Sequence, residues 1–119
     1  MTIQRIKPGP RMSGAVVHGN TVYLAGQVAQ NAAGQSVSEQ TKDILAIIDG
    51  LLAEAGTDKS QLLTVTIVLA DIRDAPAMNR AWDRWLDPAA KPARMTIEAP
   101  LVDPAWRVEI TGIAAIPDA

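Results

Sequence analysis

An arginine and a glutamate inside expected strands are the residues of this sequence best suited to chemistry. Alternation along the segment 93–98 puts Arg94 and Thr96 on one face, and alternation along 107–113 puts Glu109 on a face with Thr111. We expect both charged groups to be buried. A guanidinium offers a fork of donors to a carboxylate ligand, and a carboxylate can orient or deprotonate water.

The spacing of these two residues suggests one way for them to meet. Arg94 and Glu109 are symmetric about Leu101-Val102, so an antiparallel hairpin that closes there would place them opposite each other. The residue types alone leave two interpretations open. One is a ligand site, and the other, which composition favours, is a cross-strand salt bridge on a solvated sheet face.

Other catalytic signatures are absent from the sequence. There is no Cys, and the single histidine, His18, stands beside the turn-forming pair Gly19-Asn20, where we expect it to be exposed. A thiolate nucleophile is therefore excluded, and a Ser-His-Asp triad built on His18 is disfavoured. A tight zinc or copper site lacks its usual ligands, whereas magnesium bound through carboxylates stays open.

Length, composition and charge limit the class of protein. The 119 residues fit one domain, 1–119, and aromatic residues make up only 3% of them, so the core must be built from Ala, Val, Ile and Leu. The chain has a formal net charge of −2 and therefore lacks the excess of basic residues that nucleic-acid binding requires. No segment resembles a signal peptide or a spanning helix of about 20 apolar residues. We expect a cytoplasmic protein that binds neither nucleic acid nor a membrane.

The expected elements alternate between strands and helices. Gly19-Asn20 predicts a hairpin between the strands 15–18 and 21–25. Apolar spacing predicts a helix over 37–55, with a capping box at 36–39 and Gly56 as its left-handed end. The segment 63–69 predicts a buried strand with Leu63 on the same face as Val65, Ile67 and Leu69.

The second half of the chain repeats this alternation. Asp74 is expected to cap a second helix that ends near 87–88, followed by strands 93–98 and 107–113. The order β-β-α-β-α-β-β, with a further strand at 2–6 as an option, favours an α+β fold with both helices on one face of a single sheet. The opposite face then needs a partner, which suggests an oligomer.

Four motifs in this order resemble the RidA (YjgF) family of reactive-intermediate deaminases over nearly the whole chain. They are the run from Gly19 to Gln27, Asn79, Pro92-Ala93-Arg94 and Val108-Glu109-Ile110. The resemblance implies a chorismate-mutase-like fold with a mixed sheet. It also implies a homotrimer in which the sheets form a central barrel and the clefts lie between subunits.

The resemblance further implies an activity. Members of this family hydrolyse enamines and imines such as 2-aminoacrylate and 2-iminopropanoate to 2-oxo acids and ammonium. Carried over, Arg94 binds the substrate carboxylate, Glu109 positions water, and the Gly26 backbone, the Thr96 backbone and Asn79 line the pocket. An imine carbon is already electrophilic, so this reaction requires no metal, cofactor or covalent nucleophile.

Departures from the family pattern affect the pocket wall. Pro10-Arg11 stands where the family has Pro-Tyr, Thr96 stands at its cysteine position, and Ala25 replaces the serine before Gly26-Gln27. Arg11 would add a second cation and favour a dicarboxylate, although an exposed loop arginine is the commoner case. Trp106 is a candidate pocket residue in the loop that leads to Glu109, and packing is its alternative role.

Two other functions stay open at this point. A trimer with the same clefts would serve as a sensor that binds a carboxylate metabolite without turnover. Endoribonuclease activity is less favoured, because the chain is acidic, has a single histidine and is poor in aromatic residues that could stack on bases from a strand.

Overall fold

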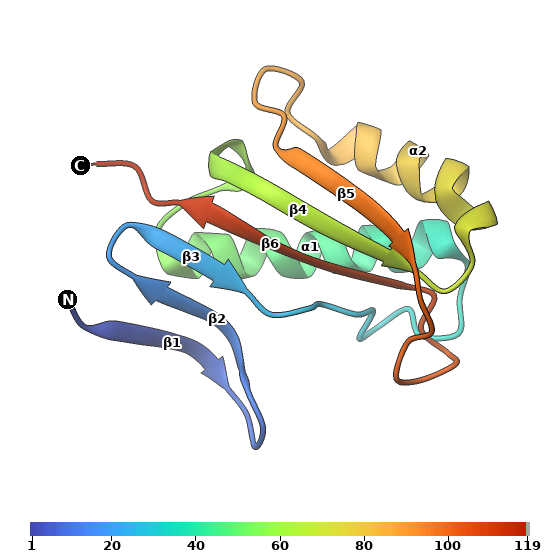
Figure 1. The fold of residues 1–119 in the computed structure, drawn as a ribbon, viewed down its shortest axis with the longest axis horizontal. Helices are drawn as coiled ribbons and strands as arrows, with labels where there is room; N and C mark the ends of the chain where they lie inside the picture. Colours follow the sequence, from blue (N-terminus) through green and yellow to red (C-terminus); the bar gives the residue numbers. More distant parts are fainter. Residues whose placement is uncertain (119) are drawn as a thin grey trace.

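Both helices pack on one face of a six-stranded sheet (Figure 1). The computed structural model describes residues 1–118. Two short 3₁₀ helices, η1 (Lys59–Gln61) and η2 (Ile72–Asp74), precede β4 and α2. The main elements are β1 (Ile3–Pro8), β2 (Ser13–His18), β3 (Thr21–Leu24), α1 (Val37–Ala55), β4 (Leu62–Leu69), α2 (Ala75–Trp85), β5 (Ala93–Glu98) and β6 (Val108–Ala115).

The strand order in the sheet is β1-β2-β3-β6-β4-β5. Only β4 and β5 run parallel, and the other neighbouring strands pair antiparallel, so the sheet is mixed. This confirms the α+β class and the placement of both helices on one face. The optional first strand is present as β1, which pairs with β2 and forms one edge of the sheet.

Local signals in the sequence set both ends of α1. The Ser36 side chain accepts a hydrogen bond from the Glu39 amide at 3.2 Å, which satisfies one of the free amides at the helix start. At the other end Gly56 has a φ of 88°, in the left-handed region that costs a glycine little. The predicted bounds of this helix are confirmed.

The start of α2 differs from the expectation. Asp74 is the N-cap residue, but its carboxylate makes no hydrogen bond to the helix amides. It pairs instead with the guanidinium of Arg107, with Nη2 and Oδ2 2.9 Å apart. The helix ends at Trp85, where Lys59 Nζ donates a hydrogen bond to the Trp85 carbonyl. A cation at this end suits the negative pole of the helix dipole.

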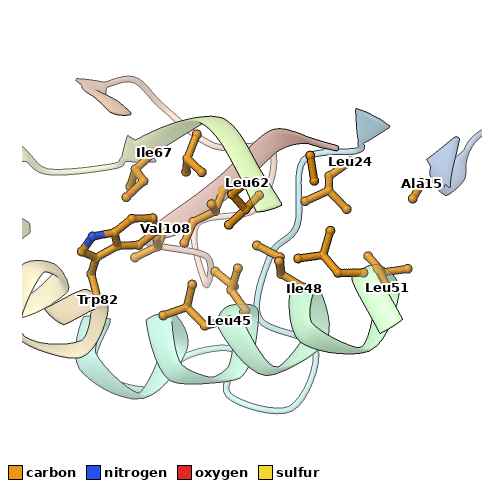
Figure 2. Packing of buried hydrophobic residues seen from close by; sticks show 14 of the residues in the cluster. Ala15, Leu24, Leu45, Ile48, Leu51, Leu62, Ile67, Trp82 and Val108 are labelled. Carbon is orange, nitrogen blue, oxygen red and sulfur yellow. The ribbon is translucent and has the colours of Figure 1, made fainter. Parts of the chain in front are cut away.

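The hydrophobic core fills the space between the helices and the sheet (Figure 2). Its buried members are aliphatic apart from Met78 and Trp82, and Trp82 is 5% exposed. Full burial of one Leu or Ile side chain contributes about 1.5–3 kcal/mol, so many small contacts replace the usual large aromatic ones.

One strand departs from the predicted register. Leu63 is 55% exposed, while Leu62 is buried with Val65, Ile67 and Leu69. A register shift between Leu62 and Thr64, at the start of the pairing of β4 with β6, reverses the alternation there. The prediction that Leu63 lies on the buried face was wrong for this reason.

The outer face of the sheet, opposite the helices, stays uncovered in the single chain. Exposed apolar side chains on it include Tyr23, Met95 and Ile97, with exposed fractions of 46%, 56% and 40%. None of the helices formed by residues 1–118 is both long enough and apolar enough to cross a membrane.

Candidate functional site

The strands that carry Arg94 and Glu109 are not neighbours. β4 lies between β5 and β6, and it is parallel to β5 and antiparallel to β6. The suggested hairpin between 93–98 and 107–113, with Arg94 opposite Glu109, is therefore wrong. The chain does not turn back between these strands because β5 returns to the far edge of the sheet after α2, in the parallel crossover that a strand-helix-strand unit makes.

Arg94 and Glu109 also point to opposite faces of the sheet. Arg94 pairs with Val65, which is buried under the helices, so the Arg94 side chain leaves the sheet on the helix face. Glu109 pairs with Val68 and alternates with the buried Val108 and Ile110, so its side chain leaves on the outer face. No cross-strand salt bridge between the two side chains can form within one chain.

Arg94 lies over the indole ring of Trp82, with its Cζ 5.4 Å from the ring centroid. Its side chain is exposed, so the expectation of burial was wrong for Arg94. The salt bridges among residues 1–118 join Lys42, Arg73 and Arg107 to carboxylates and leave Arg94 without one. The guanidinium donors of Arg94 are thus available to an anion from outside the chain.

Two further predicted residues lie on the same side of the sheet as Arg94. Asn79 is on α2, one turn before Trp82, and is half-buried. Thr96 follows Arg94 on the same face of β5, and its hydroxyl oxygen is buried with no hydrogen-bond partner among residues 1–118. An unpartnered buried hydroxyl costs about 1–3 kcal/mol, which a partner from another molecule would recover. We call Arg94, Trp82, Asn79 and Thr96 the arginine half-site.

Glu109 meets Gly26 on the other side of the sheet. A Cβ atom placed on Gly26 would lie 2.0 Å from Glu109 Oε2, a distance that no pair of unbonded heavy atoms tolerates. Glycine at this position therefore lets the half-buried carboxylate lie against the backbone. We call Gly26 and Glu109 the glutamate half-site.

Gln27 fixes the position of Gly26. Its backbone forms a bridge with Ile110, with N···O distances of 2.8 and 3.0 Å. Its nearly buried side chain donates hydrogen bonds to the carbonyls of Gly14 and Ala25 at 3.2 and 3.1 Å. These contacts hold the segment after β3 against β6, next to Glu109. Sequence reasoning quoted Gln27 only as part of a motif and did not predict this role.

A buried glutamine anchors the loop that leads to Glu109. Gln40 of α1 is completely buried, and its side-chain amide donates to the carbonyls of Gln35 and Ala105. Its oxygen accepts a hydrogen bond from the Arg107 amide at 2.9 Å. One side chain thus joins the helix to the residues just before β6.

The other two predicted residues lie in loops. Arg11 is exposed in the connection between β1 and β2, and Trp106 is half-buried in the connection between β5 and β6. No hydrogen bond or salt bridge in the described part of the chain joins either residue to Arg94 or Glu109. Their assignment to the site stays a prediction.

A carboxyl group with a strongly lowered pKa lies near the start of α2. Hydrogen bonds from the Arg73 side chain, and then from its backbone amide, lower the pKa of Asp71 to about 2. Arg107, which pairs with Asp74, adds a smaller effect in the same direction. Residues 1–118 bring no three His, Cys, Asp or Glu side chains together as a metal site would require.

The two half-sites can act on one ligand only if they come from different chains. The sheet separates them within a chain, because each side chain leaves its strand on the opposite face. Together they would supply a cation for a carboxylate, a carboxylate for water, and backbone groups near both.

Comparisons with known proteins agree with this fold. A family model described as Endoribonuclease L-PSP matches residues 2–116. A RutC family protein of Haemophilus influenzae is 50% identical over 114 residues, which are 96% of this chain and 98% of the relative. A crystal structure of a YjgF family member from Neisseria meningitidis is 42% identical, with a TM-score of 0.96 over 100% of this chain and 98% of the other.

A relative with a named activity is more distant. The 2-iminobutanoate/2-iminopropanoate deaminase of Capra hircus is 34% identical over 107 residues, which are 86% of this chain and 77% of the relative. The family model and the relatives each cover most of the chain, and the solved structure has the same fold. The chain therefore belongs to the RidA/YjgF family.

Proposed function

We propose that this protein hydrolyses small 2-imino acids and their enamine tautomers, such as 2-iminopropanoate and 2-aminoacrylate, to 2-oxo acids and ammonium. We further propose that it works as a homotrimer whose sites lie between subunits. Family membership and the named deaminase relatives support the reaction class.

The proposal rests mainly on the exposed guanidinium of Arg94, which has no salt bridge among the described residues. Its guanidinium is exposed, lies over an aromatic ring and has no carboxylate of its own chain. A planar fork of donors in this state suits the two oxygens of a substrate carboxylate. The nearby Thr96 hydroxyl, buried without a partner, is a second group that a bound molecule would satisfy.

We assign the activation of water to Glu109. In the proposed reaction Glu109 takes a proton from water as the water oxygen adds to the imine carbon. That proton passes to the imine nitrogen, which gives a carbinolamine. The hydroxyl proton of the carbinolamine then moves to the same nitrogen as the carbon–nitrogen bond breaks, so that the 2-oxo acid forms and ammonia leaves. One water is consumed for each ammonia released, so the cycle balances without a redox step or a covalent enzyme intermediate.

The separation of the half-sites supports the proposed assembly. A second copy must bring its own Glu109 to Arg94, since the sheet divides these side chains within one chain. The uncovered outer face, with its exposed apolar side chains, offers a surface for that contact. The number of three subunits comes from the family resemblance.

An imine-release assay tests the activity. An amino-acid oxidase generates the imino acid in situ, semicarbazide competes for it, and the release of free 2-oxo acid is followed with and without the protein. We expect acceleration by the wild type and none by Arg94→Ala. The matched control is Arg80→Ala. It removes an exposed arginine that lies on α2 rather than on β5, and it should behave as the wild type.

Three results would count against the proposal. An unchanged rate with several amino-acid precursors would exclude the deaminase, and saturable binding of a 2-oxo acid without turnover would favour a metabolite sensor instead. A monomer mass by light scattering at micromolar concentration would exclude the assembly.

A further inference from the structure

The surface beneath Arg94 is the face of one nearly buried aromatic ring. Trp82 is 5% exposed and belongs to the core, so its indole cannot move away without repacking that core. Figure 2 shows its ring in the layer between helices and sheet, beside Ile67 and Val108. The Arg94 Cζ lies 5.4 Å from the ring centroid, within the range of a cation–π interaction.

We propose that Trp82 is a positioning residue, and that its ring holds the Arg94 guanidinium in the orientation that binds a carboxylate. This inference rests on the proposed function, because it assigns a role to the ring that supports the same arginine. The sequence favours packing over ligand binding for Trp82, and neither the motifs nor the resemblance places it in the site.

The physical argument begins with the freedom of the arginine side chain. Arg94 is exposed at the edge strand β5 and has no salt bridge to fix it. A free arginine loses most of its rotamer freedom when it grips a ligand with two hydrogen bonds, and this loss weakens binding. An arginine already held over a rigid ring has lost part of that freedom before the ligand arrives.

A ring suits this task better than a carboxylate would. A carboxylate partner would occupy the N–H donors that must reach the substrate, and it would place a negative charge beside the incoming anion. An aromatic face attracts the cation through its quadrupole and adds no net charge. Trp82 can therefore orient Arg94 without competing for the ligand.

A test must separate the ring from its bulk, because Trp82 is also a core residue. Trp82→Phe keeps an aromatic face, and Trp82→Leu keeps apolar bulk without one. Trp85→Leu removes the neighbouring indole, whose centroid is 5.5 Å from that of Trp82, and leaves the ring under Arg94 in place. Circular dichroism and light scattering establish that each variant is folded and assembled as the wild type is.

The primary measurement is the affinity for 2-oxobutanoate by isothermal titration calorimetry. We expect Trp82→Leu to weaken binding about tenfold, which corresponds to about 1.4 kcal/mol, and Trp82→Phe to weaken it by less than about threefold. Trp85→Leu should bind as the wild type does, and Arg94→Ala should not bind measurably. In the imine assay Trp82→Leu should raise KM and leave kcat nearly unchanged. In the NMR spectrum of Trp82→Leu, the Arg94 Nε–H signal should lose the ring-current shift that the indole causes in the wild type.

Each outcome decides between the two proposals. Unchanged binding by Trp82→Leu, or equal losses in Trp82→Phe and Trp82→Leu, overturns the positioning role and leaves the deaminase proposal intact. If the wild type binds 2-oxobutanoate but does not hydrolyse imines, the deaminase proposal is overturned. The binding measurements on the Trp82 variants then still test the positioning role of the ring. Absence of 2-oxobutanoate binding by the wild type overturns both.

Discussion

Arg94 and Glu109 project from opposite faces of one sheet, and the whole of β4 separates their strands. Each half of the candidate site is built by local contacts of its own. Trp82 lies under Arg94, and Gly26 makes room for Glu109. Under the proposed assembly, folding of a single chain therefore prepares two half-sites, and each is completed by a neighbouring copy.

This arrangement predicts that two inactive variants will restore each other. Arg94→Ala and Glu109→Ala each destroy one half-site and leave the other intact. In mixed trimers, a cleft with Arg94 from one copy and Glu109 from the next regains both groups. Random assembly of equal amounts should recover about one quarter of wild-type activity in the imine assay.

The control for this experiment is the double variant. A chain that carries both Arg94→Ala and Glu109→Ala has no half-site to donate, so its mixture with either single variant should stay inactive. Failure of the two single variants to restore activity, despite subunit exchange seen by mass spectrometry, would show that the two residues do not share a site.

Adding one methyl group at Gly26 should disturb the glutamate half-site. A Cβ there would overlap Glu109 Oε2, so the carboxylate must move. We expect Gly26→Ala to lower kcat/KM by about 10- to 100-fold, since displacements near 1 Å have effects of this size. The fold should be retained, because Gly26 is exposed and has no positive φ.

Gly50→Ala provides the matched control for this substitution. Gly50 lies inside α1, and a Cβ there meets no atom within 4 Å. Alanine in a helix interior should raise the free energy of unfolding by about 0.5–1 kcal/mol and leave the activity unchanged. Equal kcat/KM values for the two alanine variants would contradict the assigned role of Gly26.

Loss of the buried glutamine should destabilise the protein strongly. Gln40→Leu would remove the partners of the Gln35 carbonyl and the Arg107 amide, while the Ala105 carbonyl keeps its bond from the Gly34 amide. Unpaired buried polar groups cost about 1–3 kcal/mol each. We expect the free energy of unfolding, measured in urea, to fall by about 3 kcal/mol. A loss within experimental error would mean that water replaces the side chain.

The stability contributed by Asp71 should depend on pH. Arg73 lowers the pKa of this carboxyl from 3.8 to about 2 in the folded protein. A depressed pKa means that the stabilisation is present above pH 3.8 and is lost as the pH falls toward 2. Asp71→Asn should lower Tm slightly at about pH 6, and the difference should shrink in the acid range. High salt should reduce it as well, because the pair is exposed. A difference that grows toward low pH would contradict this assignment.

Local sequence signals predicted the elements well. The turn pair Gly19-Asn20 and the helix boundaries at Ser36 and Gly56 depend on neighbouring residues, and the structure has them at those positions. The register shift at Leu63 has no such local signal, because both Leu62 and Leu63 suit a buried position. The pairing of β4 with β6 determines which of these two adjacent leucines is buried.

Contacts between distant segments could not be predicted in the same way. The symmetry of Arg94 and Glu109 in sequence suggested a hairpin, but the parallel pairing of β5 with β4 depends on where α2 packs. The position of Trp82 under Arg94 depends on that same packing. Alternation correctly predicted which neighbours share a strand face with each charged residue. It did not predict which of the two faces lies under the helices.

The scarcity of aromatic residues makes Trp82 a natural optical probe. Within the described chain it is the one aromatic member of the buried core cluster, and it also lies under the guanidinium of Arg94. Its emission is sensitive to the exclusion of water when the chain folds and to the charge beside the ring when an anion binds. A protein with a core rich in phenylalanine and tryptophan would mix these signals with many others. With Trp85 and Trp106 replaced by phenylalanine, Trp82 is the one tryptophan left, and its emission then reports both the integrity of the core and the occupancy of the arginine half-site.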